Sequence, residues 1–157
     1  DVGCGVGFLV EALIEQGIDV WGLDHSSVVV AAALPSVSDR VVLGALGSGE
    51  FSHPVSMKMP FDVAVCTAVL ERLPDDIMLA ASQQLAGLAH RVVVTTPKPN
   101  LWDRLDPTCC NLRSREAWLD TFRQAGLREK NVESSAVFGA GYEHDPDMTF
   151  AVLMCAD

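Results

Sequence analysis

Apolar residues along the chain fall into short continuous runs that are separated by segments with helical spacing. The short runs, which are typical of buried strands, cover residues 18–23, 40–46, 61–66 and 91–96. Apolar side chains recur at helical spacing in the intervening segments 8–16, 28–34, 77–88 and 114–125. This regular alternation predicts an α/β fold built on a doubly wound, mostly parallel sheet.

Residues at the expected helix boundaries agree with this pattern. Gly17 is suited to end the first helix, and Ser26 or Ser27 can cap the second. Pro74 can open the third helix and Ser114 can cap the fourth. The boundary signals and the apolar spacing therefore predict the same helices.

The chain closes with two β-rich runs, residues 132–138 and 148–154, which are joined by a loop rich in glycine and aspartate. Such a connection predicts that the two runs pair antiparallel. The expected sheet is therefore mostly parallel, with an antiparallel strand at its C-terminal end.

The first seven residues, Asp1–Gly7, form a glycine-rich turn directly before the first predicted helix. Glycines at alternate positions allow positive φ angles and leave room for a ligand against the backbone at a helix N-terminus. A loop of this kind can also simply close a turn. The nucleotide-binding interpretation gains support from Asp24, which ends the next strand and can accept hydrogen bonds from both hydroxyls of a ribose.

The spacing of the loop separates two classes of cofactor. In the dinucleotide fingerprint the third glycine would fall at Phe8, so the NAD-dependent pattern fails. The pattern D-x-G-x-G-x-G with Asp24 resembles the cofactor loop of class I S-adenosylmethionine-dependent methyltransferases. Residues 61–66 followed by 69–73 resemble the fourth strand of that family and the segment after it. The resemblance covers nearly the whole chain.

This resemblance implies a Rossmann-like sheet with the strand order 3-2-1-4-5-7-6 and S-adenosylmethionine as the cofactor. Ligands of such sheets bind beyond the carboxyl ends of the strands. The residues expected to bind the cofactor come from the loop and from the ends of two strands. They are Asp1, Gly3, Cys4, Gly5, Gly7, Asp24, His25, Thr67 and Ala68.

The chain also departs from the family pattern. Many relatives carry an Asp near the end of the third strand that binds the adenine amino group, but residues 45–47 contain none. Either a backbone group or Glu50 takes that role. Many relatives also have a His where Arg72 stands, so a base carried over from that position is in doubt.

Three residues are candidates for a catalytic base, namely Glu71, Asp106 and His25. Each can instead be a solvated group or a cofactor contact, and methyl transfer can proceed by alignment and desolvation without a dedicated base. The segment 106–111 resembles a D-x-T-H-x-N segment of some small-substrate members, with Cys109 in place of the His. We interpret it as a substrate-side loop.

We expect residues 1–157 to form one S-adenosylmethionine-binding domain. Asp1 would normally follow a buried strand of apolar residues, so the chain looks like a fragment in which the first strand is largely missing. Because that strand is central in a doubly wound sheet, we expect the fragment to be only marginally stable.

Composition limits the partners. Lys and Arg number 11 against 21 Asp and Glu, which gives a formal charge of −10 and argues against a nucleic-acid substrate. No apolar run approaches the length of a membrane span, and we expect a cytoplasmic protein with reduced cysteines. Residues 143–147 crowd metal-ligand types into one turn, a geometry that does not favour a metal site.

The function expected from these features is methyl transfer from S-adenosylmethionine to a small-molecule acceptor, such as the hydroxyl or amine of a sugar or another metabolite. A noncatalytic partner subunit with the same fold is the main alternative, and an NAD-dependent oxidoreductase is a weaker one. The sequence leaves the acceptor and the oligomeric state open.

Overall fold

The computed structural model describes residues 1–49, 55, 58–99, 106–130 and 148–155, and in the last strand the side chain of Leu153. The strands are β1 (Gly22–Asp24), β2 (Val41–Leu43), β3 (Phe61–Thr67), β4 (Ala89–Pro97), β5 (Leu127–Lys130) and β6 (Met148–Cys155). The α-helices are α1 (Phe8–Glu15), α2 (Ser27–Ala31), α4 (Met78–Leu88) and α6 (Arg115–Gln124). Two short 3-10 helices, η1 (Leu70–Arg72) and η2 (Asp75–Ile77), follow β3.

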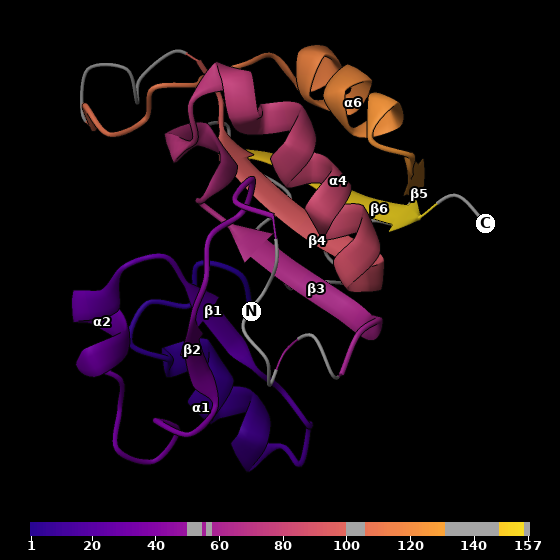
Figure 1. Cartoon of the computed structure of the whole chain (residues 1–157). Coiled ribbons are helices and arrows are strands. Elements are labelled where there is room, and N and C mark those ends of the chain that lie inside the picture. The colour runs from indigo at the N-terminus through magenta and orange to yellow at the C-terminus, as the bar shows by residue number, and fades with distance from the viewer. Residues whose placement is uncertain (50–54, 56–57, 100–105, 131–147, 156–157) are drawn as a thin grey trace.

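The strands form two hydrogen-bonded groups, β2-β1 and β3-β4-β6-β5, which lie side by side in Figure 1. Val2 joins the two groups, because it bridges in parallel to Leu23 on one side and to Cys66 on the other. Its amide donates to the carbonyl oxygen of Val65 at 2.7 Å. With residues 1–3 in the central position, the arrangement confirms the predicted doubly wound order and its antiparallel end.

The described C-terminal strand pair includes a strand, β5, that the sequence pattern did not predict. β6 pairs antiparallel with β5, and an antiparallel pair was expected at this end of the sheet. β5 begins at Leu127, shortly after the end of α6. The predicted strand 132–138 lies outside the described residues. Gly126, at φ +86°, follows α6 and turns the chain into β5 without an intervening loop.

Three predicted elements are shorter in the structure. β1 and β2 pair only from Gly22 with Val41 to Asp24 with Leu43, so the predicted strand residues 18–21 and 44–46 lie outside this ladder. α2 ends at Ala31, and the amide of Leu34 donates to Val6 instead of continuing the helix. Its run of β-branched valines is a poor helix former, which fits the early end.

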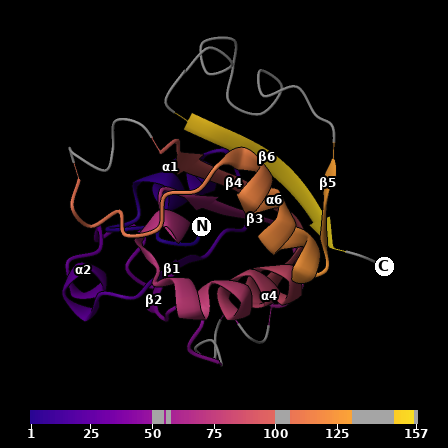
Figure 2. The same ribbon diagram turned by 90° about the horizontal axis from the view of Figure 1, so that it is seen from above.

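The core lies between the four-stranded sheet and the helices α4 and α6, which cover the same side of that sheet in Figure 2. Trp118 and Phe122 on α6 are fully buried and stack with ring centroids 5.9 Å apart. Ser114 caps α6 as predicted, since its hydroxyl accepts from the amide of Ala117 at 3.2 Å. Of the helices in the described residues, none has the length and apolar character needed to cross a membrane.

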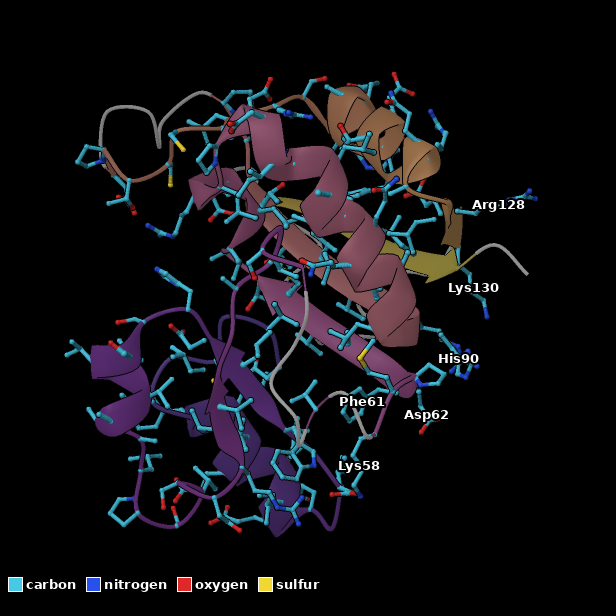
Figure 3. All side chains as sticks on the ribbon, viewed as in Figure 1. Lys58, Phe61, Asp62, His90, Arg128 and Lys130 are labelled. Carbon is cyan, nitrogen blue, oxygen red and sulfur yellow. The ribbon has the colours of Figure 1, made fainter. Side chains whose placement is uncertain are left out.

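A mostly apolar groove, here called the central groove, separates β1 from β3 on the side of Val2 away from the glycine loop. It has a volume of about 310 Å³, and its walls include Ile18, Trp21 and Val63. The amino group of Asp1 lies at this groove and donates to the carbonyl oxygen of Trp21 at 2.8 Å. Phe61 marks the end of β3 remote from Val2, beside Lys58 (Figure 3). Among the described residues, no strand lies between the facing edges of β1 and β3 along this groove.

Candidate functional site

The glycine loop runs from Val2, at the centre of the sheet, to the first turn of α1. Gly3, Gly5 and Gly7 all have positive φ angles, of +77°, +58° and +97°. A Cβ on Gly3 would lie 2.2 Å from a methyl carbon of Val69, and one on Gly7 would lie 2.9 Å from a methyl carbon of Val37. Gly5 differs, because a Cβ there would meet no atom within 4 Å. Packing against the protein thus explains glycine at positions 3 and 7, whereas Gly5 borders open space.

Asp24, at the end of β1, is the polar partner of this loop. Its Oδ2 accepts from the amide of Gly5 at 3.0 Å, and its Oδ1 accepts from the amide of Ser26 at 2.9 Å. A carboxylate offers roughly four lone-pair sites, so about two are still available to hydroxyl groups of a ligand. The same contacts hold the loop in place before any ligand arrives.

A pocket of about 490 Å³ opens at the carboxyl ends of β1 and β3, and we call it the loop pocket. Its walls are mostly apolar, with a few charged or polar groups. The residues that line it are Val2, Gly3, Leu23, Asp24, His25, Gly44, Ala45, Leu46, Ala68, Val69, Arg72, Leu73, Pro74 and Ile77.

Of the nine residues expected to bind a cofactor, the structure places four in the walls of this pocket: Gly3, Asp24, His25 and Ala68. The remaining five lie in the loop or its neighbouring strands, outside these walls. Asp1 differs most from the expectation, because it lines the central groove, where its carbonyl oxygen accepts from the amide of Leu23 at 2.8 Å.

The cysteine thiols flanking the loop lie in a protected environment. Burial raises the pKa of Cys4 to about 11, and the nearby charge of Asp24 adds to this effect. Burial also raises the pKa of Cys66, beneath Val2, to about 12. Neither thiol is poised as a nucleophile at neutral pH.

The candidate bases occupy three different environments. The side chain of His25 is 80% exposed and places Nδ1 3.5 Å from Oδ1 of Asp24. Glu71 is 1% exposed, and its Oε2 has no hydrogen-bond partner among the described residues. Burial raises the pKa of the Glu71 carboxyl group. Of the three, His25 is the one that lines the loop pocket.

Asp106 is committed to contacts within its own turn and with Arg72. Its Oδ1 accepts from the amide of Thr108 at 3.0 Å and from the hydroxyl at 2.6 Å, and its Oδ2 lies 2.9 Å from a terminal nitrogen of Arg72. Thr108 and, to a smaller extent, Arg72 lower the pKa of this carboxyl group to about 2. Such a carboxylate is a weak base near neutral pH.

The segment 106–111 packs against η1 and the residue after it. The backbone amide of Asn111 donates to the carbonyl oxygen of Glu71 at 2.9 Å. Its side-chain amide nitrogen donates to the carbonyl oxygen of Leu73 at 3.3 Å. The thiol of Cys110 donates to the carbonyl oxygen of Arg72 at 3.5 Å. These contacts hold the predicted substrate-side loop beside the wall of the loop pocket.

Two features of the pocket were missed by the sequence analysis. Ala68 has φ +55°, a left-handed conformation that is uncommon for a residue with a side chain and often occurs at functional sites. Arg72 was noted only as a departure from the family, yet it lines the pocket. Nothing in the sequence signals the positive φ of Ala68. Arg72 could have been found, because a charged residue shortly after an apolar strand is a signal of a site at the end of that strand.

The region expected to face adenine is partly visible. Gly44, Ala45 and Leu46 line the loop pocket, and the amide of Gly47 donates to the side chain of Gln84. Glu50 lies outside the described residues, so the alternatives of a backbone group and Glu50 both stand. Residues 143–147 lie outside them too. Within the described part of the chain no group of three or more His, Cys, Asp or Glu side chains could hold a metal ion.

Comparison with known proteins gives the family. A family model described as a methyltransferase domain matches residues 1–132. A ubiquinone biosynthesis O-methyltransferase from Aliivibrio fischeri (strain MJ11) is 34% identical over 83 residues, which make up 52% of this chain and 36% of that relative. The match therefore covers a minor part of the length of that relative.

Solved structures agree on the fold. A TehB-like SAM-dependent methyltransferase from Corynebacterium glutamicum gives a TM-score of 0.73 at 22% identity, covering 99% of this chain and 78% of that one. CalO1, a methyltransferase in calicheamicin biosynthesis in its SAH-bound form, gives 0.64 at 25% identity, covering 99% and 48%. The chain therefore belongs to the methyltransferase domain family, and within it to the class I S-adenosylmethionine-dependent methyltransferases with a Rossmann-like sheet.

Proposed function

We propose that this chain binds S-adenosylmethionine in the loop pocket and transfers its methyl group to a hydroxyl oxygen of a small-molecule acceptor. The observation that carries the proposal is Asp24, which is fixed by two backbone amides at the edge of the pocket and keeps lone pairs for a ribose. Family membership supports the cofactor, and the names of the O-methyltransferase relatives support oxygen as the acceptor atom.

The residues of the chain would divide the work between binding and alignment. Asp24 would accept the ribose hydroxyls, Gly5 would leave room for the ligand, and Ala68 would form the wall near the end of β3. When bound, the cofactor supplies a methyl group that is already activated by a sulfonium sulfur. The apolar walls, including Leu46 and Ile77, would exclude water, so alignment and desolvation can provide much of the rate.

We assign no catalytic base. Glu71 is buried and does not line the loop pocket, and Asp106 is held by an ion pair with Arg72 and by hydrogen bonds from Thr108. His25 is accessible but lies beside Asp24, the residue that we assign to the ribose. The proposed function therefore rests mainly on positioning the acceptor, and the proton that its hydroxyl loses on methylation passes to solvent water.

Replacing Asp24 by alanine is expected to weaken binding of S-adenosylmethionine by about 1–3 kcal/mol, because charged-acceptor hydrogen bonds to the ribose are lost. Isothermal titration calorimetry measures this difference. Asp39→Ala is a suitable control, because it removes an exposed carboxylate that does not line the pocket. An unchanged affinity in Asp24→Ala would contradict the role assigned to Asp24.

The alternatives predict different outcomes. A noncatalytic partner subunit could bind the cofactor without transferring its methyl group, since a fold does not by itself fix an activity. Incubation with methyl-labelled S-adenosylmethionine and a panel of phenols, catechols and sugars tests transfer directly. An NAD-dependent oxidoreductase would instead bind a nicotinamide dinucleotide, and the same calorimetry with NAD separates that possibility.

A further inference from the structure

Arg72 places a permanent positive charge in the wall of the loop pocket. It is the sole Lys or Arg among the described residues that line this pocket, and its side chain is 41% exposed. An arginine stays protonated at every pH at which the protein is folded. The pocket proposed for a cationic cofactor therefore carries a like charge in its own wall.

Three contacts fix the position of this guanidinium group. Nε donates to the carbonyl oxygen of Ala68 at 3.1 Å, directly at the end of β3. One terminal nitrogen lies 2.9 Å from Oδ2 of Asp106, and the other donates to the hydroxyl of Thr108. Because the donors point in three directions, Arg72 cannot swing away from the pocket without losing them.

Asp106 is the negative partner in this arrangement, and it is held as firmly as Arg72. Its second carboxylate oxygen accepts from both the amide and the hydroxyl of Thr108. The low pKa of Asp106, caused by Thr108 and then by Arg72, keeps it ionised near neutral pH. Arg72 and Asp106 thus form a neutral pair beside the pocket.

The two ligands of a methyltransferase respond differently to such a pair. S-adenosylmethionine carries a positive charge on sulfur, whereas S-adenosylhomocysteine, the product, has an uncharged thioether. An uncompensated Arg72 would repel the first through its sulfonium and leave the second nearly unaffected. Asp24 also lines the pocket, but its charge contributes equally to ligand affinity in the parent protein and in variants of Arg72 or Asp106, so it does not change the comparison.

We propose that Asp106 is the counter-ion that allows the loop pocket to hold a sulfonium cation beside Arg72. The Arg72–Asp106 pair then sets the preference of the site for the charged cofactor over its neutral product. This inference rests on the proposed function, because it concerns the same pocket and the same cofactor. It gives Asp106 an electrostatic role in place of that of a base.

The test is the ratio of two dissociation constants, measured by calorimetry with S-adenosylmethionine and S-adenosylhomocysteine separately. A solvent-screened interaction between two unit charges at a partly exposed site changes an affinity by several fold. Asp106→Asn is therefore expected to raise the dissociation constant of S-adenosylmethionine by about fourfold. The dissociation constant of S-adenosylhomocysteine should stay within about twofold of that of the parent protein. Arg72→Gln should shift the ratio in the opposite direction.

Two controls make the result specific to the pair. Asp120→Asn removes the same charge from an Arg123 partner on α6, which does not line the pocket, so its ratio should match that of the parent protein. Raising the salt concentration should shrink the effect of Asp106→Asn, because mobile ions screen partly exposed charges. Retained affinity for S-adenosylhomocysteine shows at the same time that each variant is folded.

The outcomes separate the inference from the function on which it rests. The parent protein must first bind both ligands. If Asp106→Asn and Arg72→Gln then leave the ratio of the two dissociation constants unchanged, including the case in which both affinities fall equally, the counter-ion role is wrong and the proposed function stands. If the parent protein binds neither ligand, the proposed function itself is overturned, and the inference falls with it.

Discussion

Replacement of Gly5 by valine is expected to abolish binding of S-adenosylmethionine while most of the fold survives. The backbone of Gly5 has φ +58°, a conformation that β-branched residues strongly avoid, and its Cβ would point into open space. The side chain would fill the open space beside the loop, where the proposed function places the ligand, and the strained loop would draw the amide of residue 5 away from Asp24. We expect a dissociation constant weaker than about 1 mM by calorimetry.

Gly17→Val is a matched control for this experiment. Gly17 has φ +78°, and a Cβ there would also meet no atom within 4 Å, but it follows α1 at the end away from the loop. Both variants should lose a similar amount of stability, about 1–2 kcal/mol or somewhat more for a β-branched side chain. If Gly5→Val binds the ligand as well as Gly17→Val does, Gly5 merely closes a turn.

Joining a short apolar strand to Asp1 should stabilise the protein strongly. The facing edges of β1 and β3 flank the central groove, and the amino group of Asp1 already lies in it. Five or six residues rich in valine and isoleucine would pair with both edges and bury apolar walls such as Trp21 and Val63. After the entropy of ordering the segment is subtracted, the gain should be on the order of 3 kcal/mol.

Thermal denaturation measures this gain. A stabilisation of about 3 kcal/mol corresponds to an increase in Tm of about 6–12 °C for a domain of this size, together with a sharper transition. An extension of equal length made of glycine and serine is the control, because it has no apolar side chains and a low preference for the strand conformation. Equal Tm values for the two extensions would show that the groove does not accept a strand.

The loop and its acid could be predicted from the sequence because their signals are local. Three alternate glycines before a helix, and an aspartate after an apolar run, each define a backbone position without reference to distant residues. The parallel bridge from Val2 to Leu23 then brings Asp24 to the loop. Such a pattern is readable from the sequence because glycine is the residue that adopts positive φ angles without a steric penalty.

The ion pair that borders the pocket could not be predicted in the same way. Arg72 and Asp106 lie on separate segments, and their contact depends on how the turn at Thr108 packs against η1. The sequence therefore suggested a base at Asp106, whereas the structure shows a carboxylate already bound by donors. Side-chain partners across such distances follow from tertiary packing, which periodicity does not report.

The lengths of the early strands were also beyond the sequence. Apolar runs predicted strands over residues 18–23 and 40–46, but a ladder needs a partner as well as a suitable side-chain pattern. β2 ends at Leu43 because β1 ends at Asp24, and Gly44 makes one more bond to the carbonyl oxygen of Asp24 at 2.9 Å. Residues 45 and 46 then turn to line the pocket.

Because of the position of Val2, two equilibria are thermodynamically linked: the association of the two strand groups and the binding of a ligand in the loop pocket. This residue bridges both groups of strands, and the glycine loop continues directly from it with Gly3, whose amide donates to the carbonyl oxygen of Leu23 at 2.7 Å. A ligand that favours the ordered loop must also favour the joined sheet, by mass action. Conversely, whatever secures the two groups to each other prepares the loop, so a change far from the pocket can alter affinity without touching the ligand.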